Sequence, residues 1–441
     1  MKKVALISFG CAKNLIDSEV MLGYLDKARY TFTSDPVKAD IVILNTCGFI
    51  EPARKEAIQA LREVARLKRK AKEKKIIVVG CYVERNKKSL KENFPEIDLW
   101  LGVNDFDKIV QAIEGKPFKE SQYSYLDDHA SPRHLSTPPA WTYVKISEGC
   151  SHQCSFCSIP LIKGSYRSRT ISSILKEVEE LGSKGVKEVN LVSQDSTYFG
   201  QDQGLDEGLS LLLKELLKIK EIEWIRFLYG YPEEISDSLL EIMQEKKICS
   251  YLDIPFQHSD SEIIRKMKRG MDGKRALRLV HKIRKKIPDI ALRTSLVVGF
   301  PGEGREEFES LKKFVKEARF DHLGIFTYSK EEGTDSFTLG DPVRESTKIK
   351  RKEKIMEIQT EISYQNNQKY LNKQIDVLIE GTQKENSRTL IGRGRFQAPE
   401  VDGIIFIETQ SASQISEIIN SIQKVEIYSL DIYDLYGKLV Q

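Results

Sequence analysis

Three cysteines lie close together in the run EGCSHQCSFCSIP, at Cys150, Cys154 and Cys157. Their C-x3-C-x2-C spacing places three thiols within eight residues, one fewer than a closed four-iron cluster requires. Such a cluster would keep one iron open, and an open iron can hold a substrate or a cofactor. A structural zinc site is the alternative, but it needs four ligands. Recruiting His152 as the fourth gives a spacing that fits no usual zinc finger.

Three further cysteines each follow a predicted strand. Cys11 follows VALISFG, Cys47 follows DIVILNT and Cys81 follows KIIVVG. The carboxyl ends of parallel strands share one edge of a sheet, where ligands usually bind, so these thiols could converge. Each has a glycine neighbour that would let backbone approach a bulky cluster, namely Gly10, Gly48 and Gly80. The alternative is three unrelated buried cysteines, and repetition of the same location argues against it. Cys249 lacks this setting and is assigned to structure.

The elements that must position the second cysteine set form an α/β pattern in the first hundred residues. Short apolar runs predict strands at 4–9, 40–46, 75–80 and 98–102. Amphipathic segments predict helices over 17–28 and 52–75, the second with Pro52 in its first turn. This alternation predicts an N-terminal domain, residues 1–118, built on a small doubly wound parallel sheet.

A second strand–helix alternation begins after a proline-containing linker, residues 119–140. Strands are predicted at 141–147, 188–194, 224–230, 251–257, 290–300 and 322–329. Helices are expected between them. Eight such units close a barrel, so six predict an open, partial (β/α)6 barrel over residues 141–371, with a charged helix at its end.

The last segment changes character and alternates polar and apolar residues. It predicts strands at 374–380, 388–397, 403–409 and 423–437. These favour a small antiparallel, OB-like β-barrel over residues 372–441. The whole chain is therefore predicted to be an α/β protein of three domains.

Polar residues that end the barrel strands are expected to line the mouth that carries the first cysteine set. Ser193, Gln194, Asp195 and Gln257 are the candidates for contacts with a bound cofactor. Arg293 is a charge within an otherwise apolar strand, which is costly unless an anion pairs with it. A salt bridge to a barrel carboxylate and a cofactor carboxylate both remain open as its partner.

Composition limits the class of protein. The chain has 441 residues, 40% of them hydrophobic, and a net charge of +4, which does not suggest a protein that coats nucleic acid. No apolar run approaches the roughly 20 residues of a membrane helix. The apolar stretch after the first two lysines is too short for a signal peptide. Seven cysteines without a secretion signal indicate a reducing cytoplasm and metal ligation.

These motifs resemble a known family over essentially the whole chain. The C-x3-C-x2-C run after the first strand of a partial barrel resembles the radical S-adenosylmethionine (SAM) enzymes. The upstream GCAKNLIDSE, NTCGFIEPA and GCYVE, with a terminal barrel of the TRAM type, resemble the methylthiotransferases among them. The turn GFPGE departs from the pattern, because it only loosely resembles the G-x-I-x-G-x-x-E of other radical SAM enzymes.

Two branches of this family are known, and the sequence resembles the RimO-type branch, which modifies an aspartate of small-subunit ribosomal protein twelve. Lys13 of GCAKN, the run YLDIPFQHSD and the final EIYSLDIYDLYG resemble that branch. The tail from Asn372 holds seven Lys/Arg against ten Asp/Glu. A module that grips tRNA should be basic, so an acidic tail better suits a basic ribosomal protein. Methylthiolation of a tRNA adenosine, the work of the other branch, is the nearest alternative.

The resemblance implies cofactors and partners. Cys150, Cys154 and Cys157 would hold one 4Fe-4S cluster that binds SAM, and Cys11, Cys47 and Cys81 would hold a second that carries the sulfur. The substrate would be the ribosomal protein, free or in the 30S subunit. A reductant such as flavodoxin or ferredoxin and a sulfur donor are also implied, and we expect a monomer. A non-catalytic iron–sulfur carrier is an alternative of another class, although a carrier would more often complete its clusters with four cysteines.

Overall fold

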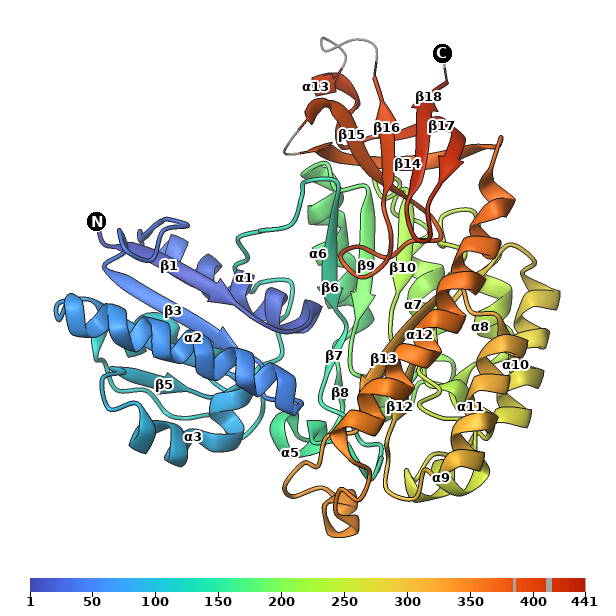
Figure 1. The fold of residues 1–441 in the computed structure, drawn as a ribbon. Coiled ribbons are helices and arrows are strands. Elements are labelled where there is room, and N and C mark those ends of the chain that lie inside the picture. The colour runs from blue at the N-terminus through green and yellow to red at the C-terminus, as the bar shows by residue number, and fades with distance from the viewer. Residues whose placement is uncertain (384–385, 410–414, 441) are drawn as a thin grey trace.

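The structure is a computed structural model that describes residues 1–383, 386–409 and 415–440. Figure 1 shows three parts in chain order: an α/β lobe, a half-open barrel of parallel strands and a small closed β-barrel. None of the helices in these residues is both long and apolar enough to span a membrane.

The N-terminal lobe contains five parallel strands in the order β2-β1-β3-β4-β5. They are β1 (Lys3–Ser8), β2 (Thr31–Phe32), β3 (Ile41–Thr46), β4 (Lys75–Gly80) and β5 (Leu99–Leu101). This confirms the predicted doubly wound sheet, and the order places the topological switch between β1 and β3. The two-residue edge strand β2 was not predicted, because so short a segment carries no periodicity.

Helices cover both faces of this sheet. They are α1 (Ala12–Lys27) and α4 (Ile109–Glu114) on one face, and α2 (Glu51–Lys70) and α3 (Cys81–Asn93) on the other. The helix α1 also contacts the barrel, so polar residues on it are buried between the two parts. The helix α3 escaped prediction because few of its residues are apolar and Asn86 interrupts its helical backbone.

Six parallel strands form the central barrel, as predicted. They are β6 (Trp141–Lys145), β9 (Glu188–Val192), β10 (Trp224–Phe227), β11 (Tyr251–Asp253), β12 (Ala291–Val298) and β13 (His322–Thr327). They form two sheets, β6-β9-β10 and β11-β12-β13, that meet at a parallel bridge between Ile225 and Ile248. No strand pairing closes β6 onto β13 among the described residues, so this barrel is open.

Helices surround the outside of the open barrel, and short elements shape its ends. The helices are α6 (Ile171–Ser183), α7 (Gly208–Leu216), α8 (Asp237–Ile242), α10 (Gly273–Lys286), α11 (Arg305–Ala318) and α12 (Glu345–Asn367). The short elements are β7 (Ser147–Glu148), α5 (Ile159–Lys163), β8 (Arg167–Ser168) and α9 (Ser261–Lys266). Short 3₁₀ helices lie at Phe106–Lys108, Gln201–Gln203, Pro232–Glu234, Asp335–Leu339 and Gln368–Tyr370.

The C-terminal barrel closes in the order β14-β15-β16-β18-β17. Its elements are β14 (Gln374–Gln383), β15 (Asn386–Gly394), β16 (Ile405–Glu408), α13 (Ile415–Ile418), β17 (Ile422–Leu430) and β18 (Leu435–Leu439). Every pairing is antiparallel, as predicted, except that of β16 with β18, which is parallel. A closed ring of five strands cannot alternate direction all the way round, so one parallel pair is unavoidable.

A buried ion network fastens the C-terminal barrel to the central one. Glu188 at the start of β9 binds Arg226 (Nε–Oε1 2.9 Å) and Arg393 of β15 (Nη2–Oε2 2.6 Å). All three side chains are at most 1% exposed. Burial raises the pKa of Glu188, but Arg393 and Arg226 lower it by more, so the pKa lies below its ordinary value.

Replacing Glu188 with Gln is expected to lower the free energy of unfolding by about 3–5 kcal/mol, because Arg226 stays buried without its carboxylate and Arg393 keeps only Glu380. Urea denaturation at pH 7 would measure this. The folded-state pKa is depressed, so the contribution of Glu188 is complete above its unfolded pKa of about 4.3 and disappears as the pH falls below it. Glu223→Gln is the matched control, because Glu223 pairs with Lys187 at a site that is 44% exposed. Equal stability of both variants would contradict the prediction.

Candidate functional site

The structure brings Cys11, Cys47 and Cys81 (the N-terminal triad) to one edge of the lobe. They follow the neighbouring strands β1, β3 and β4, and Cys81 is the first residue of α3. A Cβ on Gly10 would lie 2.9 Å from the Cβ of Cys47. A Cβ on Gly48 would lie 3.1 Å from the carbonyl carbon of Cys81. The three segments therefore pack so closely that only glycine fits between them.

The thiols of the N-terminal triad also interact electrostatically. Burial raises the pKa of Cys47 to about 11, and the thiol of Cys11 adds to this rise. Burial raises the pKa of Cys81 as well, with further contributions from Cys47 and Cys11. All three are free cysteines. The three sulfurs thus lie near one another without a disulfide, at the switch point where ligands of such sheets bind.

Cys150, Cys154 and Cys157 (the barrel triad) lie in a loop that the strands β7 and β8 bracket. The loop is tied at its base, where the Cys150 amide donates to the Gly164 carbonyl at 3.0 Å. A turn within it is closed by the Cys157 amide, which donates to the Cys154 carbonyl at 3.1 Å. The segment 149–166 between β7 and β8 (the thiol loop) is therefore a compact loop that carries the three thiols at the carboxyl end of β6.

Burial raises the pKa of Cys150 to about 11 and that of Cys157 to about 12, and neighbouring thiols of the triad contribute to both shifts. Within the described residues, no three His, Cys, Asp or Glu side chains are placed to hold one metal ion. In a four-iron cluster each thiolate binds a different iron, so the sulfurs surround a cluster instead of a single atom. Each triad supplies three thiols, which is one fewer than the four ligands of a structural zinc site and would leave one iron of a four-iron cluster open.

Two charged or titratable side chains beside the cysteines of the barrel triad are His152 and Arg269. His152 lies between two cysteines of the barrel triad, and its Nε2 is 2.5 Å from Oδ2 of Asp195. Arg269, just after α9, places Nη1 3.7 Å from the sulfur of Cys154. Arg269 was missed because the basic run RKMKRG resembles an ordinary solvated helix end.

The three predicted cofactor contacts that follow β9 have different surroundings. The Ser193 carbonyl accepts a hydrogen bond from Nζ of Lys13 at 2.8 Å. Gln194 donates to Glu148 at 2.6 Å, and its Oε1 is buried without a hydrogen-bond partner. Asp195 is the member of this group that contacts the loop of the barrel triad directly, through His152.

Gln257 and Arg293 lie in other surroundings. Gln257 has a positive φ of 69° and is half-buried. Its backbone amide donates to the Ser295 carbonyl at 2.9 Å. The Nε of Arg293 is 3.6 Å from Oδ1 of Asp402, which lies between β15 and β16. Arg293 therefore has a carboxylate of the C-terminal barrel beside it, and Asp253 of the central barrel, its register partner on β11, also raises its pKa, so a barrel carboxylate is one of its partners as the sequence allowed.

A buried ion cluster locks the N-terminal lobe onto the central barrel. Lys145 of β6 binds Asp17 of α1, and lies 3.3 Å from Glu148 and 3.4 Å from Asp127. Lys163 of α5 joins the same group, 3.3 Å from Asp17 and 3.1 Å from Glu148. These five side chains are at most 3% exposed. The cluster holds α1, and with it the N-terminal triad, against the strand that leads to the barrel triad.

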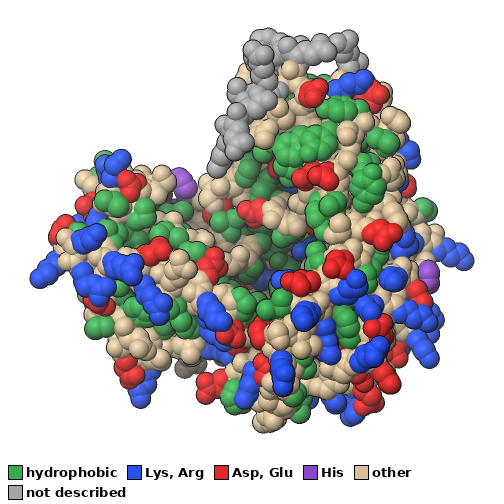
Figure 2. Space-filling model, in the orientation of Figure 1, with side chains coloured by type: hydrophobic (Ala, Val, Ile, Leu, Met, Phe, Trp, Pro, Cys, Tyr) green, Lys and Arg blue, Asp and Glu red, His purple; other side chains and the backbone are tan. Residues whose placement is uncertain are grey.

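The segment 119–140 takes part in this junction instead of acting as a free linker. It has no helix or strand, as expected. Arg133 nevertheless pairs with Glu19 of α1 at 2.7 Å and with Glu177 of α6 at 2.8 Å. The segment is thus a strap across both parts. Figure 2 shows the surface hollowed between the N-terminal lobe and the barrel beside it.

Replacing Asp17 with Asn is expected to lower the free energy of unfolding by about 3 kcal/mol, because Lys145 and Lys163 lose a shared buried carboxylate. Urea denaturation followed by tryptophan fluorescence would measure it. Asp26→Asn, at an exposed position of the same helix, is the matched control and should stay within about 0.5 kcal/mol of the unchanged chain. A similar loss of stability in both variants would show that the ion cluster does not stabilise the junction between the N-terminal lobe and the central barrel.

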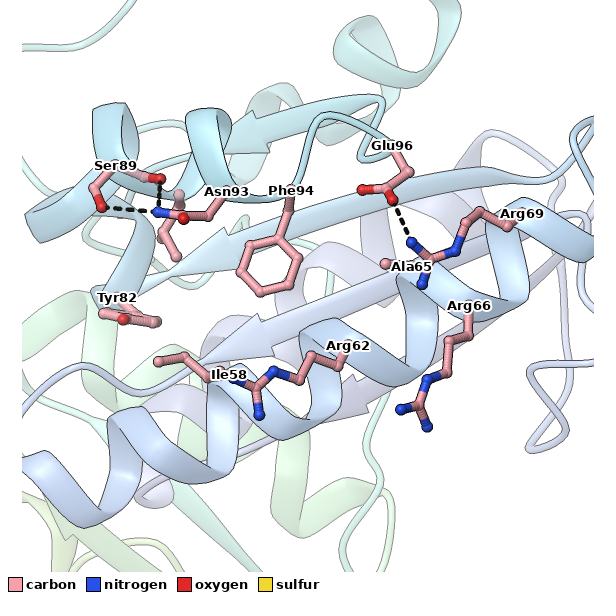
Figure 3. Close-up of a pocket in the computed structure, with 11 residues that line it drawn as sticks. Ile58, Arg62, Ala65, Arg66, Arg69, Tyr82, Ser89, Asn93, Phe94 and Glu96 are labelled. Carbon is pink, nitrogen blue, oxygen red and sulfur yellow. Dashed lines mark hydrogen bonds and ion pairs between the residues drawn. The ribbon is translucent and has the colours of Figure 1, made fainter.

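A groove of about 530 Å³ lies between α2 and α3 (Figure 3). Its lining consists of Ile58, Arg62, Ala65, Arg66, Arg69, Tyr82, Ser89, Leu90, Asn93, Phe94 and Glu96. None of the six triad cysteines and none of the predicted cofactor contacts is among these residues. The groove therefore shares no residue with the candidate site, although Tyr82 in its lining directly follows Cys81.

Three family models match the chain in order. They are described as uncharacterized protein family UPF0004 over residues 3–102, radical SAM superfamily over 144–315 and TRAM domain over 373–440. Among solved structures, the radical SAM methyltransferase TsrM from Kitasatospora setae has a TM-score of 0.56 at 13% identity, covering 76% of this chain and 77% of that one. At this identity the likeness shows the fold alone.

Full-length relatives are much more similar. A protein named ribosomal protein uS12 methylthiotransferase RimO from Thermoanaerobacter sp. (strain X514) is 45% identical, covering 95% of this chain and 96% of that protein. Proteins of the same name from Aquifex aeolicus (strain VF5) and Geotalea uraniireducens (strain Rf4) are each 43% identical. They cover 99% and 100% of this chain, and 97% and 98% of their own lengths. The chain therefore belongs to the RimO family of ribosomal protein uS12 methylthiotransferases within the radical SAM superfamily.

Proposed function

We propose that this chain transfers a methylthio group to the β-carbon of an aspartate in ribosomal protein uS12. The observation that carries the proposal is the pairing of two three-cysteine sets, each at the strand ends of its own domain, in a chain with full-length RimO relatives. A non-catalytic carrier would need neither a six-stranded open barrel nor two incomplete ligand sets.

The two triads have different roles in the proposed reaction. The barrel triad holds one 4Fe-4S cluster together with SAM, and the N-terminal triad holds a second that bears the sulfur. These groups supply the radical chemistry and the methylthio group, while the protein supplies position and excludes water. The ion cluster around Lys145 keeps the lobe and the barrel in one arrangement. Glycines beside the N-terminal triad let the three cysteine-bearing segments approach one another closely.

Contacts to SAM are proposed at the ends of the barrel strands. Asp195 is the first candidate, because it contacts His152 of the loop that carries the barrel triad. Gln194 offers an unpartnered buried oxygen that could accept from an ammonium group. Ser193, Gln257 and Arg293 remain predictions, and no catalytic acid or base is assigned. The division into residues 1–118, 119–140, 141–371 and 372–441 also remains a prediction.

Partners beyond the substrate follow from the chemistry. The proposed reaction needs a reductant, such as flavodoxin or ferredoxin, and a sulfur donor. The enzyme would act as a monomer in the cytoplasm, on uS12 free or in the 30S subunit. The acidic C-terminal barrel, with seven Lys/Arg against ten Asp/Glu, favours a basic protein over tRNA as the bound partner.

A competition experiment tests the choice of substrate. The anaerobically reconstituted chain would receive SAM, a reductant and sulfide, with small-subunit ribosomal proteins and bulk tRNA offered together. Mass spectrometry is expected to find a mass gain of one methylthio group on uS12 alone. A gain only on tRNA would overturn the substrate. Absence of SAM cleavage on reduction would overturn the enzyme assignment in favour of the carrier.

A further inference from the structure

We propose that Arg269 is a positioning residue whose guanidinium, held against the sulfur of Cys154, makes the cluster of the barrel triad easier to reduce. The inference rests on the proposed function only in assuming that this triad holds a cluster. It concerns a residue outside the cysteine motif, 112 positions after Cys157 in the chain.

The position of the guanidinium is fixed from two sides. Its Nη1 lies 3.7 Å from the Cys154 sulfur, and its Nη2 donates to the Pro255 carbonyl at 2.8 Å. Pro255 follows the strand β11, so the hydrogen bond anchors Arg269 to the mouth of the barrel. The backbone amide of Arg269 donates to the Ile264 carbonyl at 3.0 Å, which closes the turn after α9. The cation is therefore built into the barrel mouth rather than free on a solvated chain.

An aromatic column supports the guanidinium. Its central carbon lies 4.0 Å from the ring centroid of Tyr231. The imidazole of His152 stacks on the same ring, with centroids 3.8 Å apart and planes 10° from parallel. Two groups this close to one ring must occupy its opposite faces. His152 is itself part of the thiol loop and bonds Asp195, so the column connects the loop to Arg269 through side chains alone.

The charge arrangement favours a role in the reduction potential. Reduction passes one electron from the reductant to the cluster and makes it more negative, so a fixed cation nearby stabilises the reduced form more than the oxidised one. Hydrogen bonds to the sulfurs and the local charge are the means by which proteins set such potentials. Arg269 acts on Cys150 and Cys157 as well as on Cys154, so its charge faces the whole triad. The carboxylate of Glu233 also acts on Arg269 and offsets part of its charge, whereas Asp195 is paired with His152.

The test is a redox titration of the full chain followed by electron paramagnetic resonance, without SAM. Cys11, Cys47 and Cys81 would be alanine in every sample, so that only the barrel cluster contributes. Arg269→Gln is expected to reduce the ratio of reduced to oxidised cluster about tenfold at a fixed potential, a fall in midpoint of about 59 mV. Arg269→Lys, which keeps the charge, should restore most of the difference. Arg265→Gln, which removes an exposed charge paired with Glu262 on α9, is the matched control and should not change the midpoint.

An unchanged midpoint in Arg269→Gln would overturn the proposal and leave Arg269 as a structural anchor of the loop. The titration contains no SAM, so an unchanged midpoint together with weaker SAM binding in a separate equilibrium measurement would make Arg269 a cofactor contact instead. If Arg269→Gln fails to retain iron, Tyr231→Leu provides the second test, because without the ring the guanidinium is no longer held against the Cys154 sulfur and the midpoint should fall. A midpoint in Tyr231→Leu equal to that of the parent would likewise overturn the proposal. The titration needs no substrate, so failure of methylthio transfer would be recognised separately.

Discussion

Replacing Cys11, Cys47 and Cys81 together with alanine is expected to abolish methylthio transfer to uS12 while SAM cleavage continues. The N-terminal triad belongs to a different domain from the SAM-binding loop, so its loss removes the sulfur-bearing cluster and leaves the barrel triad intact. Iron in the anaerobically loaded chain should fall from about eight atoms to about four. Iron analysis, release of 5′-deoxyadenosine and mass spectrometry of uS12 would measure the three quantities.

Cys249→Ala is the matched control for these substitutions. Cys249 is 1% exposed and packs in the core between the central and C-terminal barrels, away from both triads. Its removal should cost some stability through the cavity it leaves, but iron content and transfer should be unchanged. Methylthio transfer by the variant without the N-terminal triad would contradict a two-cluster reaction. Loss of SAM cleavage in that variant would contradict the assignment of SAM cleavage to the barrel triad alone.

The convergence of the N-terminal triad was predictable because it follows from topology alone. Parallel strands end at one edge, so cysteines that follow β1, β3 and β4 are brought together whatever their separation in the chain. Local patterns were equally sufficient for the strands of the open barrel, whose apolar runs are continuous because both faces are covered. These predictions needed only the order of the elements and not the packing of any one side chain.

Contacts between domains could not be predicted in the same way. Lys145 and Asp17 are 128 positions apart, and neither has a pattern that reveals a buried partner. Arg293 shows the same limit, because its charge in an apolar strand predicted an anion but not that Asp402 of the C-terminal barrel would lie beside it. Arg269 was hidden for the opposite reason, since it lies in a basic run of ordinary composition. Its importance depends on Tyr231 and the thiol loop, which only the folded chain brings to it.

Replacing Cys150, Cys154 and Cys157 with alanine is expected to abolish both SAM cleavage and methylthio transfer, because this triad holds the cluster that binds SAM. About four iron atoms should remain on the N-terminal triad. The sharper experiment mixes this variant with the one that lacks the N-terminal triad. Each chain then carries one complete cysteine set, but the ion cluster around Lys145 and the strap at Arg133 join lobe and barrel within a single chain. Transfer should therefore stay at background in the mixture. Its recovery would show that the two triads can cooperate between chains, and that the buried junction is not what brings them together.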